Sequence, residues 1–226
     1  MRVISRSISA GVVALVLAAP LLARADVGIY AKGGTLGVGG GVGVGITDSI
    51  RLRAGYTALN ISRDISDTDV DYSGDLKLGG GEALVDWHPF AGSFRITGGL
   101  TFNRNKVTAD GKPSGGTYTL NDHTYTTAEI GSLDGTVKFK STAPYLGVGW
   151  GDVVDKAGHF SFIADIGILF QGSPDTKLNV NCGTAVSAMQ CAQINSDVKA
   201  EERDLNDKAD DYKYWPVVSL GVAYRF

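Results

Sequence analysis

The residues best suited to chemistry in this sequence are a histidine and a serine two positions apart. His159 and Ser161 could supply a base and a nucleophile for hydrolysis if an acid oriented the histidine. Downstream there is no Glu on the next segment, only Asp165 and Asp175. The geometry between base and nucleophile comes before residue type. We therefore expect no catalytic site and no enzyme activity.

The two cysteines could hold a metal ion or form a disulfide. Cys182 and Cys191 are the only cysteines in the chain, and His88, His123 and His159 all lie far from them in sequence. A two-cysteine metal site therefore has no nearby histidine to complete it. In an oxidising compartment the simpler interpretation is one disulfide that closes a small loop. We predict this disulfide, no metal site and no cofactor.

The carboxy-terminal segment indicates the class of fold that must position these residues. Its apolar residues Val218, Leu220, Val222, Tyr224 and Phe226 alternate with Ser219, Gly221, Ala223 and Arg225. Chain ends fray in water, so an apolar face that ends in an aromatic terminal residue is unusual in a soluble protein. It suits a barrel closed in lipid, where no strand edge can stay unpaired. Tyr224 and Phe226 resemble the terminal signal by which outer-membrane barrels are recognised and closed.

Glycine fills one face of the segment from Leu36 to Ile46. Such a row is costly in a soluble sheet, but inside a small barrel it leaves room for bulky side chains of neighbouring strands. A phosphate-binding loop is the rival interpretation. No helix pattern follows the glycines, so we reject a nucleotide site.

Alternating segments and their connections give the number of strands. Apolar residues alternate with polar or small ones at 50–57, 94–103 and 160–170. Within 73–88 and 136–150 the apolar residues move from one face of the strand to the other. A β-bulge at Gly79 to Gly81 could cause the change of face within 73–88. The change within 136–150 occurs around Pro144, a residue tolerated in sheets mainly at bulges or edges. Short connections at 47–49, 89–92 and 151–158 alternate with long ones at 62–72, 105–135 and 171–213. With a short first strand at 27–32 and a turn at 33–35, eight strands place both termini in the periplasm, whereas seven put the long loops on the wrong side.

The sequence thus predicts an all-β protein, an eight-stranded antiparallel transmembrane up-and-down β-barrel. Two long external loops are expected, one of them carrying a short helix over Ser196–Lys213 that Ser196 or Asp197 caps. Thr117 to Thr126 predicts a hairpin with its turn near Asn121, and 127–132 one helical turn.

Charged residues occupy the faces that point away from lipid. They are Arg51, Arg53, Lys77, Glu82, Asp86, Arg95, Asp165 and Arg225. An eight-stranded barrel is just wide enough for side chains to fill, so charges of both signs meet at short range and must be paired or hydrated. We predict a network of these side chains that plugs the lumen; a conduction path or ligand site is the alternative.

Residues 1–25 are typical of a secretory signal peptide. Arg2 and Arg6 precede an apolar stretch that ends at Ala23-Arg24-Ala25, which predicts cleavage after Ala25. Residues 26–226 then form the barrel domain. Removing three arginines changes the formal net charge from −3 to −6, and so acidic a chain has no nucleic-acid footprint.

The chain resembles the small eight-stranded outer-membrane barrels of the OmpA, OmpX and OmpW kind. Within this group it is similar to uncharacterised proteobacterial outer-membrane proteins in the stretches 86–90, 143–150 and 169–174. The resemblance implies fold and location in the bacterial outer membrane, and it implies no activity. The partners we expect are outer-membrane lipid, lipopolysaccharide and the barrel-assembly machinery.

Three functions remain open at this point. The first is a non-enzymatic barrel with a structural or surface-interaction role through its external loops. The second is a narrow channel for small solutes, or for apolar molecules released laterally as in OmpW-like proteins. The third is a lipid-modifying enzyme of the lipid A deacylase type. His159 lies at the predicted periplasmic end, far from the outer leaflet, which argues against the third.

Overall fold

The computed structural model describes residues 26–66, 70–113, 117–155 and 159–226. The predicted signal peptide, residues 1–25, lies outside them, and its cleavage stays a prediction. Most described residues are in β-strands, with one long helix. No helix among the described residues is long and apolar enough to cross a membrane.

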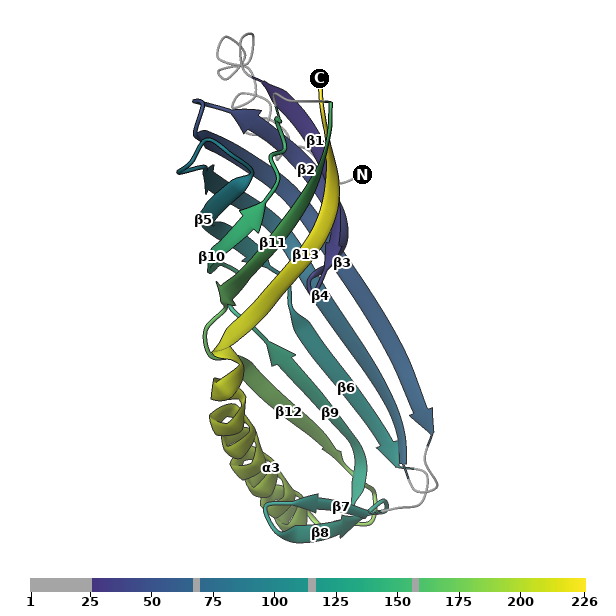
Figure 1. The fold of residues 1–226 in the computed structure, drawn as a ribbon. Coiled ribbons are helices and arrows are strands. Elements are labelled where there is room, and N and C mark those ends of the chain that lie inside the picture. The colour runs from purple at the N-terminus through teal and green to yellow at the C-terminus, as the bar shows by residue number, and fades with distance from the viewer. Residues whose placement is uncertain (1–25, 67–69, 114–116, 156–158) are drawn as a thin grey trace, which may run out of the picture.

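Eight strands close into an antiparallel barrel (Figure 1). In barrel order they are β1 (Val27–Gly34), β2 (Gly37–Gly45), β3 (Ile50–Ser66), β4 (Val70–Trp87), β5 (Phe94–Asn103), β10 (Ala143–Trp150), β11 (Phe160–Phe170) and β13 (Tyr214–Arg225). The first and last strands pair with each other, for example Ile29 with Tyr224. The predicted count of eight is confirmed, and β1 is two residues longer than expected. Its turn precedes Gly37, whose φ of +99° favours glycine.

The long connections fold into an external lobe. β3 and β4 continue past the barrel, and β4 then pairs with β6 (Lys106–Pro113), β6 with β9 (Ile130–Lys138) and β9 with β12 (Asp175–Cys182). β7 (Thr117–Leu120) and β8 (His123–Thr126) form the predicted hairpin, with Asn121 and Asp122 at positive φ in its turn. The helical turn predicted for 127–132 is wrong, because β9 begins at Ile130 and its first residues pair with β12.

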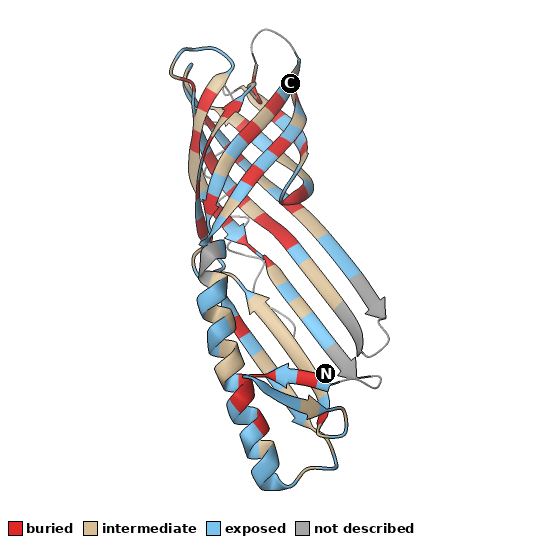
Figure 2. Cartoon of the chain, turned by 60° about the horizontal axis from the view of Figure 1, so that its bottom comes forward, coloured by how far each residue is buried: buried red, intermediate tan, exposed pale blue. Residues whose placement is uncertain are grey.

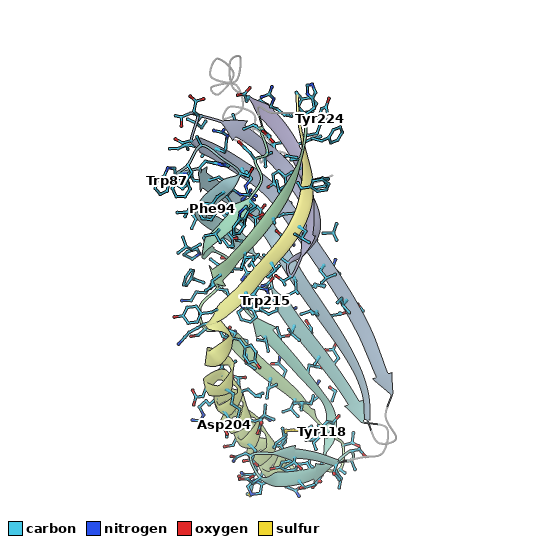
Figure 3. The ribbon with its side chains drawn as sticks, viewed as in Figure 1. Trp87, Phe94, Tyr118, Asp204, Trp215 and Tyr224 are labelled. Carbon is cyan, nitrogen blue, oxygen red and sulfur yellow. A yellow bond between two sulfur atoms is a disulfide. The ribbon has the colours of Figure 1, made fainter. Side chains whose placement is uncertain are left out.

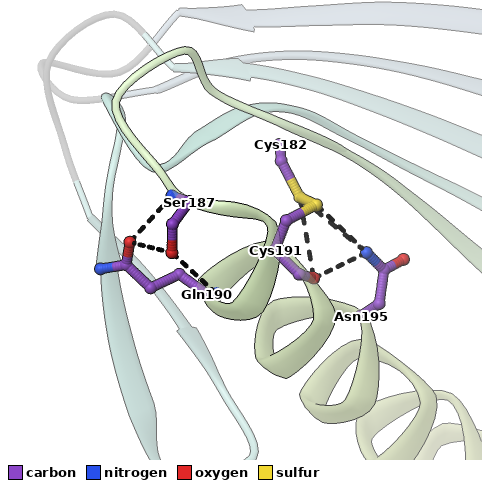
Figure 4. Close-up of a disulfide and its surroundings, with 5 residues drawn as sticks. All are labelled: Cys182, Ser187, Gln190, Cys191 and Asn195. Atoms are coloured by element: carbon purple, nitrogen blue, oxygen red, sulfur yellow. Dashed lines mark hydrogen bonds between the residues drawn. A yellow bond between two sulfur atoms is a disulfide. The ribbon is translucent and has the colours of Figure 1, made fainter.

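The helix of the lobe begins earlier than predicted. α3 spans Ala188–Ala209 and a 3₁₀ turn, η1, spans Asp210–Lys213. The Ser187 and Gln190 side chains form a capping box, in which the Gln190 N–H donates to Ser187 Oγ and the Ser187 N–H donates to Gln190 Oε1, at 3.3 and 2.9 Å (Figure 4). Ser196 and Asp197, predicted as caps, lie inside the helix.

The hydrophobic face inverts along the continuous β3–β4 hairpin. In the barrel the outward residues of β4 are apolar, including Val85 and Trp87, while Glu82 and Asp86 point inward. In the lobe, Leu76 and Leu78 share the inward face with Asp86, and Lys77 points outward. The register of β3 with β4 is unbroken from Ile50 opposite Trp87 to Ser66 opposite Asp71. The predicted bulge between Gly79 and Gly81 is therefore wrong. The phase changes because the exposed face of β4 is apolar in the barrel and polar in the lobe, while buried and exposed residues keep alternating along the strand (Figure 2).

The lobe has an apolar core between its sheet and α3. Tyr118, Leu120, Ile130, Ile194 and Val198 are buried together. Tyr118 lies in the lobe in Figure 3, whereas Trp87 and Phe94 lie at the barrel end. The predicted disulfide between Cys182 and Cys191 is confirmed, with Cα atoms 5.8 Å apart. It joins the end of β12 to the first turns of α3, so the sheet and the helix are covalently fixed to each other.

Candidate functional site

Two arginines and two aspartates form a closed cluster at the centre of the lumen. Arg53 on β3 lies between Asp86 on β4 and Asp165 on β11, with nitrogen–oxygen distances of 2.6 and 3.0 Å. Arg95 on β5 reaches the same aspartates at 3.7 and 2.8 Å. All four side chains are at most 4% exposed. Their formal charges cancel, which lowers the cost of burying them.

Hydroxyl groups complete this central cluster. The Thr97 hydroxyl donates to Asp86 at 2.6 Å, and the Ser219 hydroxyl donates to Asp165 at 3.4 Å. Arg53 Nε is not aligned for a hydrogen bond to Asp86 despite its short distance, so that contact is an ion pair. Strands β3, β4, β5, β11 and β13 are thereby joined across the lumen.

A second ion pair lies beside the central cluster. Lys32 Nζ is 2.7 Å from Glu82 Oε1, and the Tyr30 hydroxyl donates to the same oxygen at 2.8 Å. The Tyr30 ring also contacts the Arg53 guanidinium, with 5.8 Å between Cζ and the ring centroid. Lys32 and Tyr30 were not predicted as lumen residues. Both residues alternate with Val27, Ile29 and Ala31, and this pattern could have placed them on the lumen face with Gly28.

The periplasmic end of the lumen is filled by the chain itself. Val153 and Val154, from the connection between β10 and β11, are almost fully buried. A Cβ atom on Gly43 would lie 2.6 Å from Val153 Cγ1, so the glycine row of β2 makes room for this segment. Asp152, next to it, pairs with Arg51 at 3.0 Å. The glycines were predicted to leave room for bulky side chains, and at Gly43 the side chain that uses this room is that of Val153.

The external end of the lumen is apolar and nearly filled. Leu36, Leu84, Tyr145, Leu169 and Val217 pack together there. Between them and the ionic layer is a cavity of about 10 Å³, space for about one water. The lumen is thus closed by three layers: apolar, ionic and the segment around Val153.

The eight predicted lumen residues fall into three groups: inside the barrel, at its rim and outside it. Six are buried inside the barrel: Arg51, Arg53, Glu82, Asp86, Arg95 and Asp165. Arg225 is on the lumen face but at the periplasmic rim, 3.8 Å from Asp26 and partly exposed. Placing Lys77 in the lumen was wrong. At Lys77, β4 has left the barrel and pairs with Lys106 of β6, and its exposed side chain is on the outer face of the lobe.

A buried aspartate joins the hairpin β7–β8 to α3. Asp197 accepts hydrogen bonds from the Tyr125 hydroxyl and from Asn121 Nδ2 and Gln193 Nε2, both at 3.2 Å, and His123 Nδ1 lies 3.0 Å away. Chiefly because of the Tyr125 bond, the pKa of Asp197 falls to about 2. Burial and the bond to Asp197 raise the pKa of Tyr125 to about 12. No group of three or more His, Cys, Asp or Glu side chains within the described ranges could hold a metal ion.

Comparison with solved structures identifies the architecture. The crystal structure of Acinetobacter baumannii CarO2 matches with a TM-score of 0.57 and 19% identity, and that of A. baumannii CarO with 0.56 and 21%. Each match covers 89% of this chain and 98% of the other. The fold is that of a small bacterial outer-membrane β-barrel. A major outer membrane protein from Thermus thermophilus aligns with a TM-score of 0.35 and 15% identity. No protein-family model and no curated protein sequence matches the chain.

Aromatic side chains mark the two rims expected of this architecture. Exposed rings at the periplasmic end are those of Trp87, Phe90, Trp150, Phe160 and Phe226, and those at the external end are Tyr56, Phe102, Phe170, Tyr212 and Tyr214. Between them the outward face is apolar. Aromatic girdles on either side of an apolar band are typical of barrels in a membrane.

The histidine and serine considered for hydrolysis lie at the periplasmic rim. The Ser161 hydroxyl donates to the Asp152 carbonyl at 2.5 Å, and His159 Nδ1 lies 3.2 Å from the Arg225 carbonyl. The His159 ring also stacks on Tyr224. Both side chains are therefore bound to main-chain oxygens rather than arranged as a base and its nucleophile.

Proposed function

We propose that this chain is an integral outer-membrane barrel with a closed lumen, which acts without catalysis through its external lobe. The observation that carries the proposal is the central cluster of Arg53, Asp86, Arg95 and Asp165. A channel through the lumen would need a continuous cavity past Arg53 and Asp165. Instead, Arg53 on β3 meets Asp165 on β11, on the opposite side of the barrel, and so closes the centre of the lumen.

The lobe supports a role in surface interaction. It is a folded sheet with its own helix, core and disulfide, fixed to the barrel by β3 and β4. Ordered external structure on a rigid scaffold is where barrels place their recognition surfaces. Assembly through Tyr224 and Phe226 and contact with lipopolysaccharide belong to the same proposal.

Single-channel recording tests the closed lumen. Residues 26–226 are refolded in a planar bilayer, and heat-modifiable migration is used to show that the barrel has folded. We expect no stable openings. Discrete openings that change with Arg53→Ala, and not with Arg104→Ala outside the lumen, would favour the narrow channel instead. Release of fatty acid from outer-leaflet lipid by the native protein, lost in Ser161→Ala, would favour the enzyme.

A further inference from the structure

Three lysines stand side by side on the outer face of the lobe. Lys77 on β4 is directly opposite Lys106 on β6, and Lys106 is directly opposite Lys138 on β9. Cross-strand neighbours of this kind have Cβ atoms about 5 Å apart, and like charges there destabilise a sheet. These three ammonium groups make no ion pair or hydrogen bond with other residues of the described ranges. The arrangement is costly unless an anion neutralises it.

The lysine row, Lys77, Lys106 and Lys138, borders a hollow of about 560 Å³ at the external rim of the barrel. Arg104 and Tyr56 also line it, joined by a hydrogen bond of 3.2 Å. The hollow has four cationic side chains and no carboxylate in its lining, although the chain as a whole is acidic. An acidic protein therefore has a positively charged hollow at this point.

Two carboxylates border the row but lie outside the hollow. Asp175, which follows Lys138 in the same cross-strand row, lies 3.6 Å from Lys177. Asp75, two residues before Lys77, accepts a hydrogen bond from Ser62 at 2.5 Å. Neither of them lines the hollow.

The hollow lies just above the apolar band of the barrel, at the level where lipid headgroups would be. Tyr56 and Phe102 are half-exposed at the upper edge of the apolar band, and Arg104 comes two residues after Phe102. Lys77 pairs with Asn60, four residues above Tyr56, or about 13 Å along the strand. Strand tilt and the length of a lysine side chain bring its ammonium group to the headgroup layer, which is about 5–7 Å thick on each side of a bilayer.

We propose that the lysine row and Arg104 bind the phosphate groups of a phosphorylated lipid in the outer leaflet. Lysine ammonium groups bind phosphate as point charges, and an arginine can add two parallel hydrogen bonds. Apolar residues directly below would contact the acyl chains. The site rests on the proposed location of the barrel in the outer membrane, and it gives one partner of that barrel a defined position.

Lipid binding by the refolded barrel tests this site. Residues 26–226 are inserted into phosphatidylcholine vesicles containing increasing amounts of a bisphosphorylated glucosamine lipid, and the bound lipid is counted by native mass spectrometry. The row variant is K77Q/K106Q/K138Q. The matched control is K199Q/R203Q/K208Q, which removes the same charge from exposed positions of α3, none of which lines the hollow.

We expect the row variant to bind the lipid at least about tenfold more weakly, because each lysine near an anionic surface contributes about fivefold. The control is expected to stay within about twofold, since screened distant charges contribute little. Inorganic phosphate at millimolar concentration is the second arm. If it occupies the site and displaces the lipid, the source of the anion is soluble and the proposal is overturned.

Two other outcomes would also overturn it, and they differ. A barrel that inserts with heat-modifiable migration, but binds the lipid equally in the native, row and control forms, refutes the site alone. A chain that does not insert refutes the proposed function, and the site with it.

Discussion

Replacing Asp165 by asparagine should strongly destabilise the barrel. Asp165 is the shared partner of Arg53 and Arg95, at 3.0 and 2.8 Å, and its side chain is 4% exposed. Asparagine preserves the shape but leaves the central cluster with one uncompensated positive charge. At an effective dielectric constant of about 20, a charge pair at this distance is worth roughly 5 kcal/mol before desolvation. Breaking a buried pair on one side costs about 3–5 kcal/mol in practice.

The free energy of unfolding is measured by urea titration in lipid vesicles, followed by tryptophan fluorescence. The matched control is Asp175→Asn, which breaks an ion pair to Lys177 whose two side chains are about two-thirds exposed. We expect this control to change the free energy by less than about 1 kcal/mol. If Asp165→Asn costs no more than its control, the cluster does not hold the lumen closed, and the argument for a plugged barrel is wrong.

Three further perturbations test other parts of the molecule. Gly43→Ala should destabilise the barrel by about 1–3 kcal/mol, because the new Cβ would lie 2.6 Å from Val153 Cγ1; Gly98→Ala, with no atom within 4 Å of its Cβ, should not, and equal urea midpoints would contradict the filled periplasmic end. Asp197 has a folded-state pKa of about 2 against 3.8 unfolded, so its stabilisation of the lobe is complete above about pH 4 and lost as the pH falls through 2. Near-ultraviolet circular dichroism should show this loss in the native lobe but not in Asp197→Asn, and identical acid titrations would refute it. Cys191→Ser opens a loop with a sequence separation of 9, which should cost about 2–3 kcal/mol and speed proteolysis of the lobe while the barrel stays intact; unchanged proteolysis would mean that the core alone holds α3.

The barrel was predictable because lipid imposes a simple rule on its strands. The apolar face of β13, from Val218 to Phe226, is outward as the alternation requires. The same rule failed at Gly79 to Gly81. There the sequence shows that the pattern changes phase, but not whether the strand shifts or its solvent does. Only the unbroken register of β3 with β4 distinguishes the two.

The sequence showed which face of a strand each charged residue occupies, but not which other charged residue it contacts. Arg53 and Asp165 are 112 residues apart, and which charges meet depends on the stagger of a closed barrel. Lys32 was missed although its alternation with Val27, Ile29 and Ala31 places it on the face away from lipid. The capping box at Ser187 was readable from sequence. The buried role of Asp197 was not, since it depends on a hairpin more than 70 residues away.

The unbroken passage of β3 and β4 from barrel to lobe has a mechanical consequence. Ten residues of β3 lie beyond Tyr56, a length of about 33 Å along the strand. The hairpin is stiff and forms one edge of the lobe sheet, so the opposite edge, where β12 packs against α3, stands at a fixed height and orientation above the barrel. A partner that docks there meets a surface already ordered, and little conformational entropy is lost when it binds. A pull on the end of this hairpin is transmitted through β3 and β4 directly to the wall that holds Arg53 and Asp86, whereas a pull on α3 reaches the barrel through η1 and β13.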